Sequence, residues 1–231
     1  MPAATVPSSS GPPSSGPSRS GPSEAGVAEV VRFDLGERVL HWTNATLFGV
    51  VMATAAALYV PAISAAIGRR EVVKTIHVYA GLALPFPIVA TLLAGRWGAA
   101  FRADVRRLNR WSTEDRKWVR ARGRSSAARL GKFNPGQKLN ASFTAGAIVV
   151  MVATGSIMRW PKWWPVANRT GATFVHDWVF IALVVTITGH VLFAVNDPDA
   201  LASMRTGRIS TAWAKRHAPR WLDEKRGPGE E

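Results

Sequence analysis

The sequence contains no cysteine among its 231 residues. This absence excludes a disulfide, a zinc site built on thiolates and an iron–sulfur cluster ligated by cysteine. It also excludes covalent haem attachment through a Cys-x-x-Cys-His motif. Any bound metal must therefore be held by histidine, methionine or carboxylate side chains, and any haem must be bound non-covalently.

Acidic residues are also scarce: 15 Asp and Glu stand against 29 Lys and Arg, which gives a formal charge of +14. Such a charge is typical of proteins that bind nucleic acid. Here, however, the basic residues cluster at the ends of very apolar runs, and this mosaic gives a mean hydropathy close to zero. The pattern is typical of a protein that crosses a membrane several times. We therefore expect the basic residues to lie at the surface of a lipid bilayer and expect no binding to nucleic acid.

Four apolar runs are long enough to cross a bilayer core of about 30 Å as helices. They predict an all-α integral membrane protein, a four-helix transmembrane bundle. Pro85 and Pro87 predict a kink in the second span, which neighbouring helices can tolerate. The predicted spans are residues 41–60, 73–95, 139–158 and 173–195.

The segments outside the spans predict the domain organisation and the orientation. Residues 1–28 are rich in Ser, Pro and Gly and predict a disordered leader. Residues 29–200 would form the membrane domain, with a lead-in at the membrane surface before residue 41, and residues 201–231 a polar cytoplasmic tail. The regions 1–40, 96–138 and 196–231 hold 23 of the 29 Lys and Arg residues. The positive-inside rule therefore places both termini in the cytoplasm, with the protein in a bacterial inner membrane.

Four of the five histidines lie in the predicted spans: His41, His77, His176 and His190. Residues 176 and 190 share one span and are 14 positions apart, so a helix puts both on nearly the same face, ~21 Å apart along its axis. Given the direction of each span, the four histidines fall at two depths. We expect His77 to face His176 near the outer surface and His41 to face His190 near the inner surface. The fifth, His217, is assigned no role.

Two facing imidazoles are what a six-coordinate haem b needs, with one ring nitrogen on each side of the iron. The histidines therefore predict two haem b groups between the helices. Gly49, Gly81 and Gly189 lie where a flat macrocycle would approach the backbone, although small residues also serve ordinary helix packing. Two other interpretations are four separate histidines that hydrogen-bond between helices, and zinc, which two histidines per level would leave short of ligands.

Five motifs around these histidines resemble a known family: Arg38–Trp42, Ile76–Gly81, Lys132–Lys138, His176–Asp177 and Gly189–His190. They are similar to motifs of the cytochrome b (gamma) subunit of membrane-bound formate dehydrogenases, and the likeness covers about residues 30–200. The wider family of di-haem b-type cytochromes includes the cytochrome b subunits of nickel–iron hydrogenases. Where family members commonly have Ala after the Asn of the third motif, this chain has Pro135.

The resemblance implies that the four span histidines are the haem ligands and that menaquinone or ubiquinone binds near the cytoplasmic surface. The implied quinone site consists of Asn134, Gly136, Gln137 and His190. An Asn or Gln amide supplies the hydrogen-bond donors that a quinone carbonyl needs, although the Asn-Pro-Gly run by itself also predicts a turn before a helix. The implied partners are an iron–sulfur subunit and a catalytic dehydrogenase subunit, in an assembly that can form a higher oligomer. No formate chemistry is expected on this chain.

The sequence alone leaves other functions open. The cytochrome b subunit of a nickel–iron hydrogenase shares the architecture but serves another electron donor. A stand-alone b-type cytochrome that oxidises superoxide or a small quinol would be active when purified alone. A haem-free membrane scaffold or transporter is the non-enzyme alternative, and a colourless purified protein would establish it.

Overall fold

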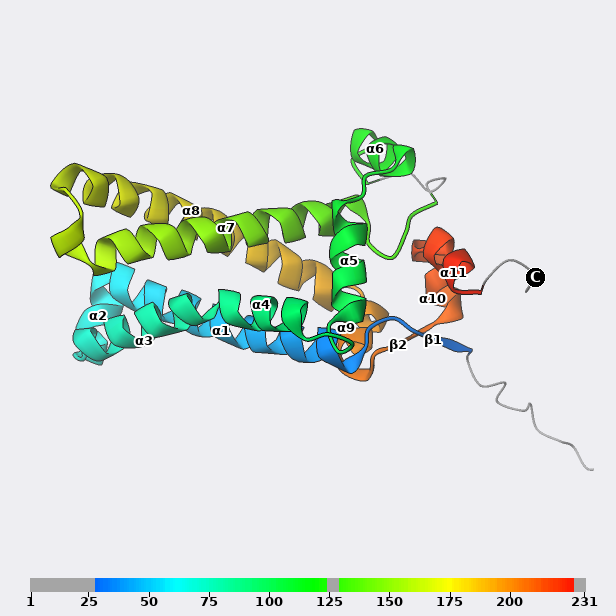
Figure 1. Cartoon of the computed structure of the whole chain (residues 1–231), viewed down its shortest axis with the longest axis horizontal. Helices are drawn as coiled ribbons and strands as arrows, with labels where there is room; N and C mark the ends of the chain where they lie inside the picture. Colours follow the sequence, from blue (N-terminus) through cyan, green and yellow to red (C-terminus); the bar gives the residue numbers. More distant parts are fainter. Residues whose placement is uncertain (1–27, 124–128, 227–231) are drawn as a thin grey trace, which may run out of the picture.

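The structure is a computed structural model that describes residues 28–123 and 129–226. The predicted disordered leader, residues 1–28, lies outside the described residues apart from Ala28. Within the described part, four long crossings pack side by side as an up-and-down bundle (Figure 1). They are α1 (Leu35–Tyr59), α3 (Arg70–Ala83) continued by α4 (Pro85–Leu93), α7 (Pro135–Arg159) and α8 (Val166–Val195).

All four crossings are long and apolar enough to span a membrane, so the predicted four-helix transmembrane bundle is confirmed. Their outer faces expose large apolar side chains: Leu93, Val185 and Phe193 are 79%, 69% and 82% exposed. Water would penalise such a surface, whereas the hydrocarbon of a bilayer suits it. Two short elements join the crossings at one end of the bundle, here called the link end: α2 (Pro61–Ile67) and the 3-10 turn η1 (Pro161–Trp163).

Local chemistry explains where the crossings begin and break. The Asp34 side chain accepts a hydrogen bond from the Glu37 backbone N–H (2.7 Å), and the Glu37 carboxylate accepts one from the Asp34 N–H (2.9 Å). This capping box starts α1 six residues before the predicted span. The second crossing breaks at Leu84, because Pro85 has no N–H to continue the helical ladder.

A folded cap covers the opposite end of the bundle, here called the terminal end because residues 29–34, 96–123, 129–134 and 196–226 lie there (Figure 1). The helix α5 (Ala99–Asn109) runs across this end and contacts α1, α4 and α7. The other cap elements are β1 (Glu29–Val31), α6 (Thr113–Arg120), α9 (Pro198–Thr206), β2 (Arg208–Ser210), α10 (Thr211–His217) and α11 (Pro219–Arg226).

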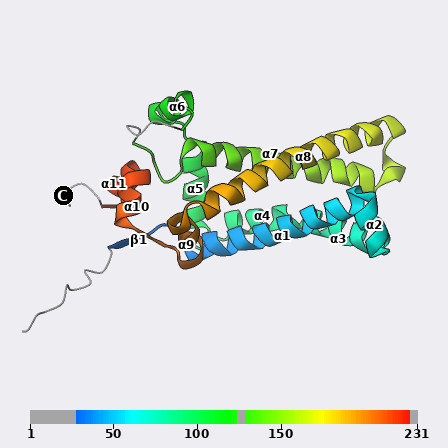
Figure 2. The ribbon, with the colours of Figure 1, turned by 180° about the vertical axis from the view of Figure 1, so that it is seen from behind.

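The two short strands hold the ends of the described chain together. Strands β1 and β2 pair antiparallel, with Val30 opposite Ile209, and both lie beyond the bundle in the two opposite views (Figures 1 and 2). Next to them, Trp213, Trp221 and Leu222 form a small buried apolar core. The polar region 96–138 and the predicted polar tail, residues 201–231, therefore contain folded elements that hydropathy did not reveal.

Candidate functional site

The four span histidines meet as two pairs between the crossings. His41 on α1 faces His190 on α8 at the terminal end, and His77 on α3 faces His176 on α8 at the link end. The ring centroids are 6.3 Å apart in each pair, with interplanar angles of 62° and 68°. The structure thus brings together the residues that the sequence had placed at two common depths.

The separation of the rings suits one metal ion between the two imidazoles of each pair. A bond from an imidazole nitrogen to a metal is ~2.0 Å long. The ring centre lies about 1.2 Å behind that nitrogen, given ring bonds of about 1.35 Å. Two rings on opposite sides of one ion would therefore have centres about 6.4 Å apart, close to the 6.3 Å found in both pairs.

The donor set excludes most metal centres other than haem. No group of three or more His, Cys, Asp or Glu residues able to hold a metal occurs in the described part of the chain. A tetrahedral zinc site needs three or four such ligands. A porphyrin brings four nitrogens of its own and requires only the two axial ligands that each pair provides.

Glycines leave open space along the crossings. A Cβ built at Gly49, Gly81 or Gly189 meets no atom within 4 Å, and the same holds for Gly146 on α7. The Cβ of any residue at Gly155 would lie 3.4 Å from Cε1 of His176, so this glycine leaves room for the ring of a paired histidine. The first three were predicted from their nearness to histidines, whereas residues 146 and 155 were missed because they are far from any histidine in sequence. The ring spacing of the two pairs, together with Gly155, means that the residues present fit a haem.

The ring nitrogens of the link-end pair are already oriented by neighbouring helices. Nδ1 of His77 lies 3.1 Å from Oγ1 of Thr54 and 3.2 Å from the carbonyl oxygen of Val51. Nδ1 of His176 lies 2.9 Å from Oγ1 of Thr154. In both rings Nδ1 is thus engaged, which leaves Nε2 as the nitrogen that can bind a metal.

Comparison with known proteins agrees with this geometry. The family profile described as prokaryotic cytochrome b561 matches residues 32–207, which include all four crossings and all four paired histidines. The chain belongs to the prokaryotic cytochrome b561 family. It is therefore a membrane cytochrome b, and membership implies a b-type haem as its cofactor.

Relatives of this cytochrome carry names from one kind of complex. The chain is 24% identical over 205 residues to the formate dehydrogenase cytochrome b556(fdo) subunit of Escherichia coli, covering 85% of this chain and 93% of the relative. It is 23% identical to the nitrate-inducible formate dehydrogenase cytochrome b556(Fdn) subunit of the same species, covering 84% and 91%. The formate dehydrogenase cytochrome b556 subunit of Haemophilus influenzae is 24% identical, with 85% and 83% covered.

Three of the four residues predicted to bind a quinone, Asn134, Gly136 and Gln137, lie at the first turn of α7, at the terminal end of the cytochrome. The fourth, His190, belongs to α8 and to the terminal-end histidine pair. Oδ1 of Asn134 accepts a hydrogen bond from the Gln137 backbone N–H, and Oε1 of Gln137 accepts one from the Asn134 backbone N–H, both at 2.9 Å. Because this capping box of α7 uses the side-chain oxygens of Asn134 and Gln137, their two NH₂ groups can still act as donors. Gly136 lies between them, where an added Cβ would come within 3.3 Å of Oδ1 of Asn134.

The cap of the cytochrome contains buried ionic groups that the sequence did not reveal. Nζ of Lys132 hydrogen-bonds to Glu37 of α1 at 3.3 Å and also to Asp104 of α5. All three side chains are no more than 7% exposed. A second buried pair joins Lys138 of α7 to Asp115 of α6 at 2.7 Å. These contacts fix α5 and α6 against the ends of α1 and α7, the helices that carry His41 and the predicted quinone residues.

An acid-dependent change at α6 is expected from the second pair. Burial alone would raise the pKa of Asp115, but hydrogen bonds from Lys138 and Ser112 outweigh it and lower that pKa below its ordinary value. The stabilisation is therefore present above about pH 4, the ordinary pKa of Asp, and is lost as the pH falls through the lowered folded-state pKa. We expect α6 to loosen from α7 in that acid range.

Tryptophan fluorescence can follow this transition, because the Trp118 ring of α6 lies against the first turn of α7. A Cβ added at Gly136 of that turn would be 3.5 Å from the ring. The Trp118 signal is the difference in fluorescence between the wild-type protein and the variant Trp118→Phe. In Asp115→Asn the side chain has no charge to lose, so this signal should not change with pH in that range. An unchanged acid transition in this variant would show that another group controls α6.

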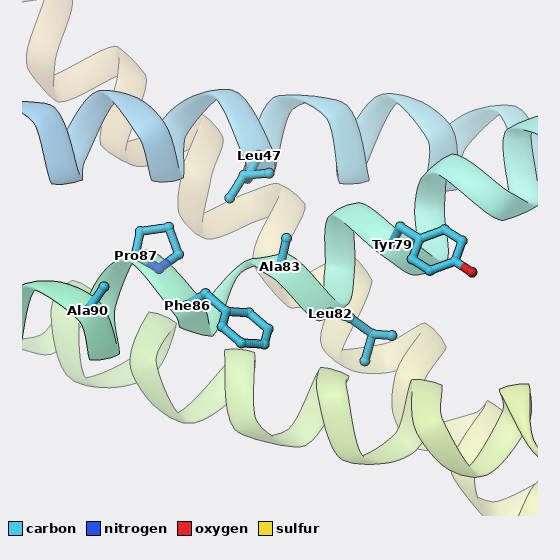
Figure 3. A pocket seen from close by; sticks show the side chains of 7 residues that line it. All are labelled: Leu47, Tyr79, Leu82, Ala83, Phe86, Pro87 and Ala90. Carbon is cyan, nitrogen blue, oxygen red and sulfur yellow. The ribbon is translucent and has the colours of Figure 1, made fainter.

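The bundle also carries a groove away from the histidines. It has a volume of about 440 Å³ and follows the break between α3 and α4 (Figure 3). Its lining is apolar apart from the Tyr79 hydroxyl: Leu47, Tyr79, Leu82, Ala83, Phe86, Pro87 and Ala90. Such a surface suits acyl chains of the bilayer.

Proposed function

We propose that this chain is the di-haem membrane subunit of a formate dehydrogenase, carrying electrons from the outer face of the membrane to a quinone near the cytoplasmic face. The observation that supports it best is the pair of matched histidine sites, each with 6.3 Å between ring centroids. The names of the relatives favour formate dehydrogenase over a hydrogenase as the partner complex.

The four histidines would act as axial ligands. Haem b would supply reversible one-electron transfer, with no free iron position for oxygen. His77 and His176 would hold the group at the link end, and His41 and His190 the group at the terminal end. The two ligands on α8 are 14 positions apart in sequence, which sets the levels ~21 Å apart.

The first turn of α7 would bind the quinone, menaquinone or ubiquinone. The NH₂ groups of Asn134 and Gln137 would donate hydrogen bonds to a quinone carbonyl, with Gly136 between them as the third residue of this turn. His190 would lie beside this site. Protons drawn from the cytoplasm and electrons moving inward would together store ~2.3 kcal/mol per charge for each 100 mV of membrane potential.

The orientation and the partners follow from the charge distribution and from the relatives. The sequence regions 1–40, 96–138 and 196–231 carry 23 of the 29 Lys and Arg residues, and their described parts lie at the terminal end. The terminal end would therefore face the cytoplasm of a bacterial inner membrane, with both termini there. The link end would face an iron–sulfur subunit, and a catalytic subunit would oxidise formate. The complex would form a higher oligomer, and the apolar outer faces of the bundle would be available for contacts between copies within the membrane.

The cofactor content of the purified protein tests this proposal. We expect a reduced-minus-oxidised visible spectrum typical of haem b and a pyridine haemochrome assay that gives two haems per chain. With its partner subunits present, formate should reduce both haems, and added quinone should reoxidise them. One haem per chain, or none, would contradict the two-site arrangement. If hydrogen reduced the two haems and formate did not, the partner complex would be a hydrogenase.

A further inference from the structure

Two threonines from neighbouring helices lie against the link-end histidines. Oγ1 of Thr54 on α1 is 3.1 Å from Nδ1 of His77 on α3. Oγ1 of Thr154 on α7, a residue that is 8% exposed, is 2.9 Å from Nδ1 of His176 on α8. Each ligand of this pair thus meets one threonine hydroxyl on the helix packed beside it.

The hydroxyl protons decide the direction of these hydrogen bonds. Oγ1 of Thr54 donates to the Val50 carbonyl at 2.7 Å, and Oγ1 of Thr154 donates to the Val150 carbonyl at 2.7 Å. A hydroxyl has one proton and two lone pairs, so each oxygen that donates to its own helix must accept from the imidazole. Nδ1 of each ring must therefore carry the proton, and Nε2 presents its lone pair to the iron.

The terminal-end pair has no equivalent support. Among residues 28–123 and 129–226, no side chain or backbone group hydrogen-bonds to either ring of His41 or His190. The two sites therefore share the same ring spacing but differ in the groups behind the ligands. An acceptor behind a metal-bound imidazole pulls on its N–H and makes the ring a more basic ligand.

We infer that Thr54 and Thr154 are positioning residues that make the link-end haem the more reducing of the two. A more basic axial ligand stabilises the ferric form, which lowers the reduction potential. An electron that enters at the link end would then move downhill to the terminal end. This inference rests on the proposed di-haem function and adds to it the origin of the direction of transfer.

Redox titration of the purified complex tests the inference. Both Thr54→Val and Thr154→Val keep the shape of the side chain. Thr154→Val removes the acceptor behind His176, whereas Thr54→Val leaves Nδ1 of His77 with the Val51 carbonyl at 3.2 Å alone. We expect the midpoint potential of the link-end haem to rise in each variant and to rise further in the double variant, while the other haem titrates as before. A lost hydrogen bond of about 1 kcal/mol corresponds to roughly a fivefold change in the ratio of reduced to oxidised haem at a fixed potential.

Serine provides the rescue and another threonine provides the matched control. The variants Thr54→Ser and Thr154→Ser keep the hydroxyl and should titrate with the wild-type potential. They remain informative if a valine variant loses the haem and cannot be titrated. Oγ1 of Thr46 on α1 donates only to the Trp42 carbonyl at 2.9 Å, so Thr46→Val should change neither potential.

The outcomes separate the inference from the proposed function. If both haems are present and the valine variants titrate like the wild type, the threonines do not tune the ligands, although the di-haem function stands. The same conclusion follows if the serine variants behave like valine. A wild-type protein without two haems would overturn the proposed function itself.

Discussion

Replacing His190 with alanine is expected to reduce the haem content from two per chain to one and to abolish quinone reduction. The terminal-end pair would lose one of its two axial ligands, because His41 alone can provide only one nitrogen to the iron. The link-end pair shares no ring with it and should keep its haem. Haem counting and quinol formation, both measured on the purified complex, check the expectation.

The complementary variant and a control sharpen this test. His77→Ala should remove the other haem and slow electron entry from the donor, while the terminal-end site keeps its own spectrum. His217, whose Nδ1 lies 3.1 Å from the Trp213 carbonyl in the cap, belongs to neither pair, so His217→Ala should keep both haems. Two haems and full quinol formation in His190→Ala would show that the pairs do not hold the cofactors.

Replacing Lys132 with methionine is expected to destabilise the protein strongly. The change removes the buried cation that Glu37 and Asp104 share, so that Asp104 keeps only the partly exposed Arg107 at 2.8 Å and Glu37 loses its ion-pair partner. Removing one partner of a buried ionic group typically costs about 3–5 kcal/mol. For a chain of this size the midpoint of thermal unfolding should fall by roughly 6–20 °C. Circular dichroism in detergent, with haem release recorded in parallel, measures the shift.

Two comparisons show whether the buried charge is the cause. The triple variant Glu37→Gln, Asp104→Asn, Lys132→Met removes all three buried charges. It leaves only the partly exposed Arg107 without its partner, so it should recover a large part of the lost stability. Lys117 pairs with Glu114 at 2.8 Å on the surface, with side chains 60% and 30% exposed. Lys117→Ala should change the free energy of unfolding by no more than about 1 kcal/mol. Equal losses in Lys117→Ala and Lys132→Met would rule out the burial argument.

The bundle and the meeting of the histidines could be predicted because both follow from regular helix geometry. Apolar runs of sufficient length give the crossings, and a constant rise per residue converts sequence position into depth. His176 and His190 then give two levels from one helix, and the direction of each crossing assigns His41 and His77 to them. The ring distances required the structure, because helix rotation and tilt are set by packing between helices.

The cap could not be predicted from hydropathy. Its apolar residues, such as Trp213 and Trp221, are spread singly among basic ones, so any window average is polar. The Lys132 cluster joins residues 95 and 28 positions apart, and a sequence offers no signal for such long-range pairs. The quinone residues were predicted by resemblance alone; the structure shows their role in capping α7, and their quinone role is still a prediction.

The unbroken course of α8 has a consequence for electron tunnelling between the two haems that we propose. Because His176 and His190 belong to one continuous 30-residue helix, hydrogen-bonded backbone would fix the gap between the two redox centres. Sliding or tilting of α1 and α3 can alter how firmly each centre is held, but it stretches that gap very little. Tunnelling falls off steeply with distance, so the transfer step should be insensitive to bilayer thickness and to the lipid in which the complex is reconstituted.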